Sequence, residues 1–159
     1  VDRTVRAEEI AADLARDYAG TPYTDQARLA VARMKMDQSL PDEAVRYLEQ
    51  VVRESSSPGL VNIAKLRLAR VRIQQEKYDE ALKELASPKD SAFAARYHEV
   101  RGDAYFAMGR ADEARAEYEA ALKGAGEGST DPAFVQAKLD QVPRAAAAPA
   151  PVTPASVTP

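Results

Sequence analysis

Small and apolar residues recur along this chain at helical spacing, and the pattern comes in copies. The tripeptide Asp-Glu-Ala occurs three times and ends at Ala44, Ala81 and Ala114. The copies are therefore separated by 37 residues (44 to 81) and by 33 residues (81 to 114). Both intervals are close to the period of roughly 34 residues that is typical of one class of helix–turn–helix repeat. The pattern predicts an all-α chain built from repeated helix pairs.

The residues that flank each copy also fall at matching positions. In the third copy the small Gly102 precedes a glycine turn at Gly109, and the small Ala114 and the aromatic Tyr118 follow. The positions equivalent to Gly102, Ala114 and Tyr118 hold Ala69, Ala81 and Leu85 in the second copy and Ala32, Ala44 and Leu48 in the first. Two antiparallel helices approach closely only where side chains are short, and a larger residue at the crossing would cost about 1–3 kcal/mol. The arrangement resembles the tetratricopeptide consensus and predicts a right-handed solenoid of about three helix pairs.

A further helix is expected at each end of the repeats. The first spans roughly residues 3–18 and carries four apolar residues at helical spacing: Val5, Ile10, Leu14 and Tyr18. The last begins after residue 131 and carries four on one broad face: Phe134, Val135, Leu139 and Val142. Because each repeat of a solenoid buries its face only against a neighbour, these helices are predicted to cap the two ends. The total is eight helices and no sheet.

Proline and glycine mark the predicted boundaries. Thr21, Ser57 and Asp131 each stand directly before a proline, which combines a capping oxygen with a first-turn proline and predicts three helix starts. Pro88 is expected to end the second helix of the middle repeat early, and the glycines in residues 124–128 to form a flexible connection. Five of the ten prolines follow Val142. We therefore assign residues 1–142 to a tetratricopeptide-like repeat domain and residues 143–159 to a disordered, Pro/Ala-rich tail.

Composition excludes several classes of function. Acidic and basic residues are mixed along the chain with a net charge of −3, so no nucleic-acid partner is predicted. The absence of cysteine excludes disulfides, thiolate metal sites and cysteine nucleophiles. The sequence has no apolar, uncharged run of the roughly 18 residues that a membrane span requires. Since the chain begins at Val1, any native membrane anchor is expected upstream of it.

Residues that could carry chemistry do not gather into a site. His98 is the only histidine, and its helical neighbours offer no partner for metal binding or proton transfer, so a packing or surface role is expected. The Asp-Glu pair of each copy opens the second helix of its repeat, where the helix dipole favours acidic side chains. No phosphate-binding loop or nucleophile motif is present. We expect neither catalysis nor a metal or other cofactor.

The surface left for function is the concave face, which the first helices of the pairs line in solenoids of this kind. Alignment of the repeats gives an apolar row, a charged row one helical turn before it, and a third row that precedes the charged row. In that order the rows are Met36, Ile73 and Phe106; Arg33, Arg70 and Asp103; and Leu29, Leu66 and Glu99. An apolar row beside charges suits an extended or helical peptide, with Phe106 as the anchor. The alternative is that some of these side chains are buried against the capping helix.

Several stretches resemble the bacterial YfgM family. They are Leu66–Val71, Lys77–Leu82 and Glu99–Asp103, with Tyr18–Tyr23 before the repeats and Gln136–Asp140 near the end. The resemblance covers about residues 5–142 and leaves the tail outside. It implies the periplasmic tetratricopeptide-like domain of an ancillary SecYEG translocon subunit, anchored in the inner membrane by an upstream helix. The resemblance also implies a membrane-anchored periplasmic chaperone of the peptidyl-prolyl isomerase type as partner.

These observations favour a non-catalytic protein-binding scaffold on the periplasmic side of the inner membrane. Two other binding roles stay open. One is a soluble adaptor that reads peptide C-termini through Arg33 and Arg70, although the asparagine of such carboxylate clamps is missing. The other is homo-oligomerisation through the apolar helix of residues 131–142. A hydrolase or metal enzyme is the remaining alternative, and the chain offers almost nothing from which to build one.

Overall fold

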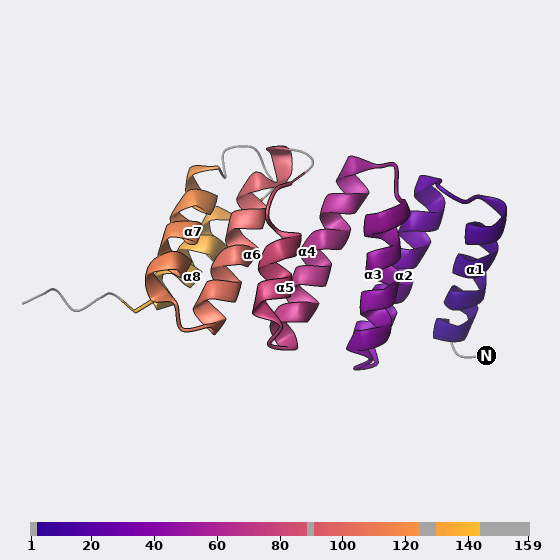
Figure 1. The fold of residues 1–159 in the computed structure, drawn as a ribbon, viewed down its shortest axis with the longest axis horizontal. Helices are drawn as coiled ribbons and strands as arrows, with labels where there is room; N and C mark the ends of the chain where they lie inside the picture. The colour runs from indigo at the N-terminus through magenta and orange to yellow at the C-terminus, as the bar shows by residue number, and fades with distance from the viewer. Residues whose placement is uncertain (1–2, 89–90, 125–129, 144–159) are drawn as a thin grey trace, which may run out of the picture.

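The computed structural model of the chain describes residues 3–88, 91–124 and 130–143. These residues form eight α-helices, one 3-10 helix and no strand. In chain order they are α1 (Arg3–Asp17), α2 (Pro22–Asp37), α3 (Pro41–Glu54), α4 (Pro58–Gln74), α5 (Tyr78–Glu84), η1 (Ser91–Phe93), α6 (Ala94–Ala107), α7 (Ala111–Lys123) and α8 (Pro132–Gln141). The helices stand side by side in one elongated row, with α1 at one end and α7 and α8 at the other (Figure 1). The predicted all-α repeat architecture is confirmed, with α2/α3, α4/α5 and α6/α7 as the pairs.

Most of the predicted helix boundaries are confirmed. The side chains of Ser57 and Asp131 each accept a hydrogen bond from a backbone amide in the first turn of the helix that follows. Thr21 also precedes its helix, but its hydroxyl donates to the carbonyl oxygen of Tyr18 at 2.8 Å instead of accepting from α2. The helix α5 ends at Glu84, ahead of Pro88, and has only 7 residues. The predicted tail beyond residue 143 and the glycines within residues 125–129 lie outside the described residues.

Short side chains let the paired helices touch, as the repeat pattern predicts. Ala44, Ala81 and Ala114 are each completely buried. At Gly102 a Cβ atom would lie 2.5 Å from Cε1 of Tyr118, which is closer than van der Waals contact permits. The aromatic ring on α7 therefore occupies the space that a side chain on α6 would need.

The apolar core is divided into three clusters that follow the repeats. The first joins α2, α3 and α4 and holds Leu29, Ala32, Ala44, Leu48, Val51, Ala64, Leu68 and Val71. The second joins α4, α5 and α6 and holds Leu66, Ala69, Ala81, Leu85, Tyr97 and Val100. The third joins α7 to α8 and holds Ala114, Tyr118, Ala121, Val135, Leu139 and Val142. Each cluster is built from neighbouring helices, which is the local packing of a solenoid.

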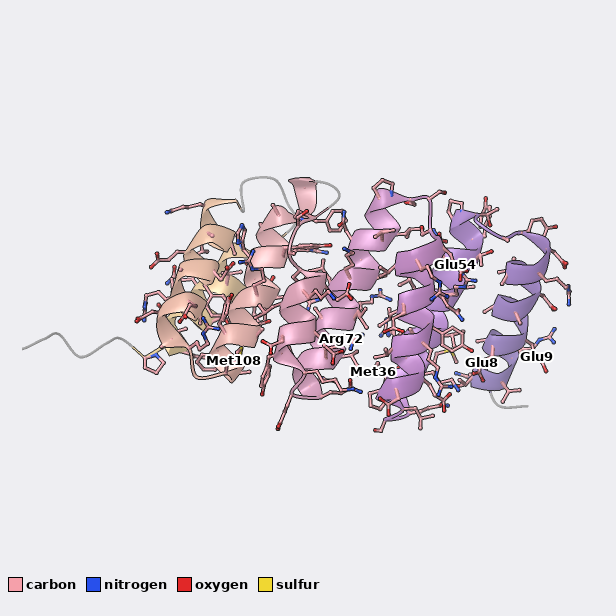
Figure 2. All side chains as sticks on the ribbon, in the orientation of Figure 1. Glu8, Glu9, Met36, Glu54, Arg72 and Met108 are labelled. Atoms are coloured by element: carbon pink, nitrogen blue, oxygen red, sulfur yellow. The ribbon has the colours of Figure 1, made fainter. Side chains whose placement is uncertain are left out.

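The inner face of α1 differs from the prediction. Val5, Ile10 and Tyr18 are 45%, 46% and 60% exposed, and Leu14 is only half-buried, whereas Thr4 and Ala11 are buried. The contacts that dock α1 are largely polar. The carboxylate of Glu8, labelled in Figure 2, lies 2.9 Å from Nζ of Lys35 on α2, and the Gln38 side chain donates to the Thr4 hydroxyl at 2.7 Å. The apolar periodicity was misleading because ion pairs and small residues orient this helix.

At the other end, α8 covers the last repeat with a narrower apolar face than predicted. Val135, Leu139 and Val142 are buried, but Phe134 is 56% exposed. Nζ of Lys138 lies 4.7 Å from the centre of the Phe134 ring, which places the cation over the exposed aromatic. Three of the four residues proposed for homo-oligomerisation are thus part of the chain's own core.

Candidate protein-binding groove

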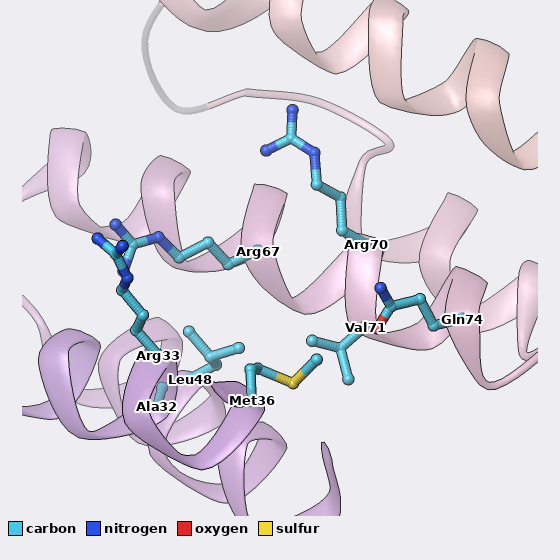
Figure 3. A pocket seen from close by; sticks show the side chains of 8 residues that line it. All are labelled: Ala32, Arg33, Met36, Leu48, Arg67, Arg70, Val71 and Gln74. Atoms are coloured by element: carbon cyan, nitrogen blue, oxygen red, sulfur yellow. The ribbon is translucent and has the colours of Figure 1, made fainter. Parts of the chain in front are cut away.

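A groove of about 270 Å³ opens between α2 and α4 (Figure 3). Its lining residues are Ala32, Arg33, Met36, Leu48, Arg67, Arg70, Val71 and Gln74. Leu48 reaches the groove from α3 and belongs to the first core cluster, as do Ala32 and Val71. The floor is therefore formed by core side chains with little exposed surface, beside the half-buried Met36. Figure 3 shows the arginine side chains rising above it.

The three arginines form a positive rim, which we call the arginine triad (Arg33, Arg67 and Arg70). All three are exposed. Arg67 donates a hydrogen bond from its guanidinium to the carbonyl oxygen of Leu29 at 3.2 Å, which fixes its side chain across the α2–α4 seam. Desolvation by the neighbouring helices lowers the pKa of Arg67, and the charges of Arg33 and Arg70 lower it further. Three like charges therefore repel one another above an apolar floor.

No carboxylate in the described part of the chain forms an ion pair with the triad. Two other arginines of the same repeats are paired. Arg72, also on α4 and labelled in Figure 2, pairs with Glu49 at 2.7 Å and with Glu80 on α5. Arg28 on α2 pairs with Glu54 at 2.7 Å. The groove thus brings together three arginines without an acidic partner among the described residues, on the same helices that carry these paired ones.

The groove brings together three of the residues predicted for binding: Arg33, Met36 and Arg70. Sequence reasoning missed Arg67 and Gln74. Arg67 lies three residues before Arg70 on α4, and Gln74 lies four residues after it. Residues at this spacing share one face of a helix, so both could have been predicted from the position of Arg70.

Leu29 and Leu66 were predicted to line the binding surface, and this is wrong. They are 6% and 3% exposed and belong to the first and second core clusters. They lie one helical turn before Arg33 and Arg70, and their side chains pack into the core between neighbouring helices. In the first two repeats this row is therefore core.

The third repeat does not continue the groove, because α8 covers its charged residues. Nζ of Lys138 lies 2.8 Å from the carboxylate of Glu99 and 2.9 Å from that of Asp103. The hydroxyl of Tyr118 donates to Asp103 at 2.8 Å, and burial, with the Asp103 charge, raises the pKa of this phenol, so that it remains a donor. Glu99 and Asp103 thus bind the capping helix, which is the alternative raised by the sequence.

The predicted apolar row is also divided. Met36 lines the groove, whereas Ile73 is half-buried against the second core cluster. Phe106 is 43% exposed on α6 and is not part of the groove lining. A ligand in the groove would therefore meet Met36 and Val71, and the role of Phe106 as an anchor stays a prediction.

His98 takes part in a link between α6 and α7. Its Nδ1 lies 2.7 Å from the carboxylate of Glu117, whose other oxygen is 2.6 Å from the Arg101 guanidinium. In the described residues, no three histidine or acidic side chains are grouped as a metal ion would require. The Asp-Glu pairs open α3, α5 and α7 as predicted. Among residues 3–88, 91–124 and 130–143, none of the helices combines the length and the apolar character needed to cross a bilayer.

Helix pairs that pack through alanine, stacked in a row and open at a groove between their first helices, define a helical-repeat binding module. Comparison with known proteins agrees with that class, and the chain belongs to the tetratricopeptide repeat-like domain family, which matches residues 2–144.

Similar proteins are each named "Ancillary SecYEG translocon subunit", in agreement with the resemblance noted in the sequence. The protein of Neisseria gonorrhoeae is 32% identical over 137 residues, which are 84% of this chain and 66% of the relative. The protein of Escherichia coli is 32% identical over 122 residues, 77% of this chain and 57% of the relative. That of Aggregatibacter actinomycetemcomitans is 30% identical over 125 residues, 79% of this chain and 58% of the relative. The chain thus spans less than two thirds of the length of these relatives.

Proposed function

We propose that this chain is a non-catalytic scaffold that acts on the periplasmic side of the inner membrane, beside the SecYEG translocon. It would hold a membrane-anchored periplasmic chaperone, or an emerging secreted chain, near the site of translocation. The names of the similar proteins support the translocon setting. The observation that carries a binding role is the groove between α2 and α4, which has an apolar lining beneath the arginine triad, and no carboxylate of the described residues pairs with these arginines.

The mechanism would be binding alone. The groove walls are helices fixed by the first core cluster, so little ordering is required when a ligand binds. Met36 and Val71 offer an apolar seat, and the triad supplies donors that restrict how a segment lies across the two helices. The placement on the periplasmic side, like an anchor upstream of Val1, belongs to this proposal.

Site-specific photocrosslinking tests it. A photoreactive amino acid replaces the exposed Gln74 in the groove or, as the control, the exposed Glu119 on α7. The chain is then incubated with membranes that contain SecYEG and its periplasmic chaperones, and crosslinked products are identified by mass spectrometry. We expect Gln74 to capture a periplasmic chaperone or a secreted chain and Glu119 to capture neither.

Equal yields from the two positions, or no product from Gln74, would remove the groove from the proposed function. Capture of cytoplasmic proteins alone would contradict the periplasmic setting.

A further inference from the structure

We propose that the groove selects an acidic segment of a partner protein, in which side-chain carboxylates bind the arginine triad and an apolar side chain rests on Met36 and Val71. This inference rests on the proposed function only in taking the ligand to be a protein. It commits to Asp or Glu side chains as the source of negative charge.

The first argument is charge complementarity. Arg33 from α2 and Arg67 and Arg70 from α4 converge on one groove, and no carboxylate of the described residues pairs with them. Figure 3 shows Arg33 and Arg67 side by side, with Arg70 pointing away from the floor on the other side of the groove. Guanidinium groups bind carboxylates through paired, charge-assisted hydrogen bonds. A ligand with carboxylates would supply the negative charges that the described residues do not provide, and would relieve the repulsion among the three arginines.

The second argument comes from the chain's own capping helix. In the repeat alignment Glu99 and Asp103 correspond to Leu29 and Arg33. In the third repeat Lys138 of α8 fills this place with a positive charge against two carboxylates. In the first repeat the nearest cation is Arg67, which meets the carbonyl oxygen of Leu29 and the like charge of Arg33. The described residues leave this seam positive, and a partner with carboxylates would complement it.

The third argument is the apolar floor. A phosphate ion or a lipid headgroup would use the triad alone and make no use of the apolar lining beneath it, to which the half-buried Met36 belongs. The groove volume of about 270 Å³ is enough for a large apolar side chain from a peptide. Floor and triad together fit a segment in which Leu, Ile, Met or Phe is flanked by Asp or Glu.

Binding of short fluorescent peptides, measured by anisotropy with the full chain, tests this selection. All peptides are acetylated and amidated, so that no terminal charge contributes. The parent peptide carries Glu residues around one Leu; the others replace every Glu by Gln, every Glu by Lys, or the Leu by Ser. We expect the Gln and Ser peptides to bind roughly tenfold more weakly than the parent. The Lys peptide should not bind, and added salt should weaken parent binding.

Charge reversal within the groove gives the matched test. The double variant Arg33→Glu/Arg70→Glu should lose the parent peptide and gain affinity for the Lys peptide. The control Arg3→Glu/Lys123→Glu makes the same change in net charge at exposed positions on α1 and α7, and should bind as the wild type does. Circular dichroism verifies that each variant is helical, and Arg33→Gln/Arg70→Gln replaces the reversal if that variant fails to fold.

Four outcomes would overturn the inference. Equal loss in the groove variant and in the control would assign the effect to net charge. Binding of a further parent peptide made with a free C-terminal carboxylate, without binding of the amidated parent, would assign the triad to chain termini. Triad-dependent binding to vesicles of anionic phospholipid, without binding to the parent peptide, would assign it to a membrane surface. If Gln74 crosslinks a partner while the Glu and Gln peptides bind alike, the selection fails and the scaffold role stands.

Discussion

Two seams of this rod differ in their electrostatics: the α6–α8 seam at the capping helix, and the α2–α4 seam between the first helices of adjacent repeats. In the α6–α8 seam, the amine of Lys138 lies between the carboxylates of Glu99 and Asp103. In the α2–α4 seam, Arg67 reaches over a backbone carbonyl toward Arg33, with Arg70 close by. The charges of the α6–α8 seam are paired and covered by the chain's own capping helix, whereas the α2–α4 seam is positively charged and opens at a groove.

The difference shows how one repeat can be specialised without a change of fold. The first and third core clusters keep the helices packed around both seams, so the charged positions are released from a structural role in one of them. Charge pairing within the chain then marks a seam used for stability, and unpaired charge marks a seam available for a ligand. Three variants test this division.

The largest effect on stability is expected when the positive charge of Lys138 in the α6–α8 seam is reversed. In Lys138→Glu, three carboxylates would meet where Glu99 is already buried, at 6% exposure. Loss of the cation from such a buried cluster should lower the free energy of unfolding by about 3–5 kcal/mol. Urea denaturation followed by circular dichroism measures it. Ala133→Glu, at an exposed position in the first turn of the same helix, is the control with little expected change.

A loss of less than about 1 kcal/mol in Lys138→Glu would mean that the pairing does not hold α8 in place. The distinction between the two seams would then lose its structural meaning.

A smaller loss of stability is expected from steric crowding between α6 and α7, next to the α6–α8 seam. Gly102→Ala places a Cβ 2.5 Å from the ring of Tyr118, the residue that donates to Asp103. The overpacked crossing should cost about 1–3 kcal/mol of unfolding free energy. Gly59→Ala is the matched control, because a Cβ at that position in α4 meets nothing within 4 Å. It should leave stability unchanged or raise it by up to about 1 kcal/mol. Thermal denaturation compares the two, and equal behaviour would contradict the assigned helix crossing.

The smallest effect on the free energy of unfolding is expected in the α2–α4 seam. Arg67→Gln removes one of three mutually repelling charges and a single hydrogen bond to a carbonyl. Its unfolding free energy should therefore stay within about 0.5 kcal/mol of the wild type. Arg72→Gln on the same helix removes the pairs with Glu49 and Glu80 and should cost about 1–2 kcal/mol. If urea denaturation gave the two variants the same loss, the triad would be structural.

The sequence predicted the repeat because small residues at fixed intervals reflect a local requirement of helix crossing, as Ala44, Ala81 and Ala114 show. It predicted the groove only in part. Whether Leu29 or Arg33 faces outward depends on how far α2 is rotated against α4, which the periodicity of one helix does not determine. Glu99 and Asp103 are covered by Lys138, which lies 39 residues after Glu99 and 35 residues after Asp103 in the sequence. The spacing within one helix does not reveal such a long-range contact.

The orientation of α1 was missed for a similar reason. Its four predicted apolar positions formed a helical pattern, but three of them are exposed. The face that is buried is defined by partners on other helices, above all Lys35, which Glu8 and Glu43 both contact. A polar interface of this kind leaves no hydrophobic stripe in the sequence.

The shortness of α5 has a mechanical consequence. Its 7 residues form barely two turns, so few of its amides have partners within the helix. In a linear array, stability is passed only between neighbours, and a weak unit in the middle separates the units on either side. Amide hydrogen exchange should therefore be fastest in this helix, and warming should part the rod there before either half melts. The helices before α5, which hold the α2–α4 groove, and the helices after it, which hold the α8 cap, would then unfold independently under force or heat.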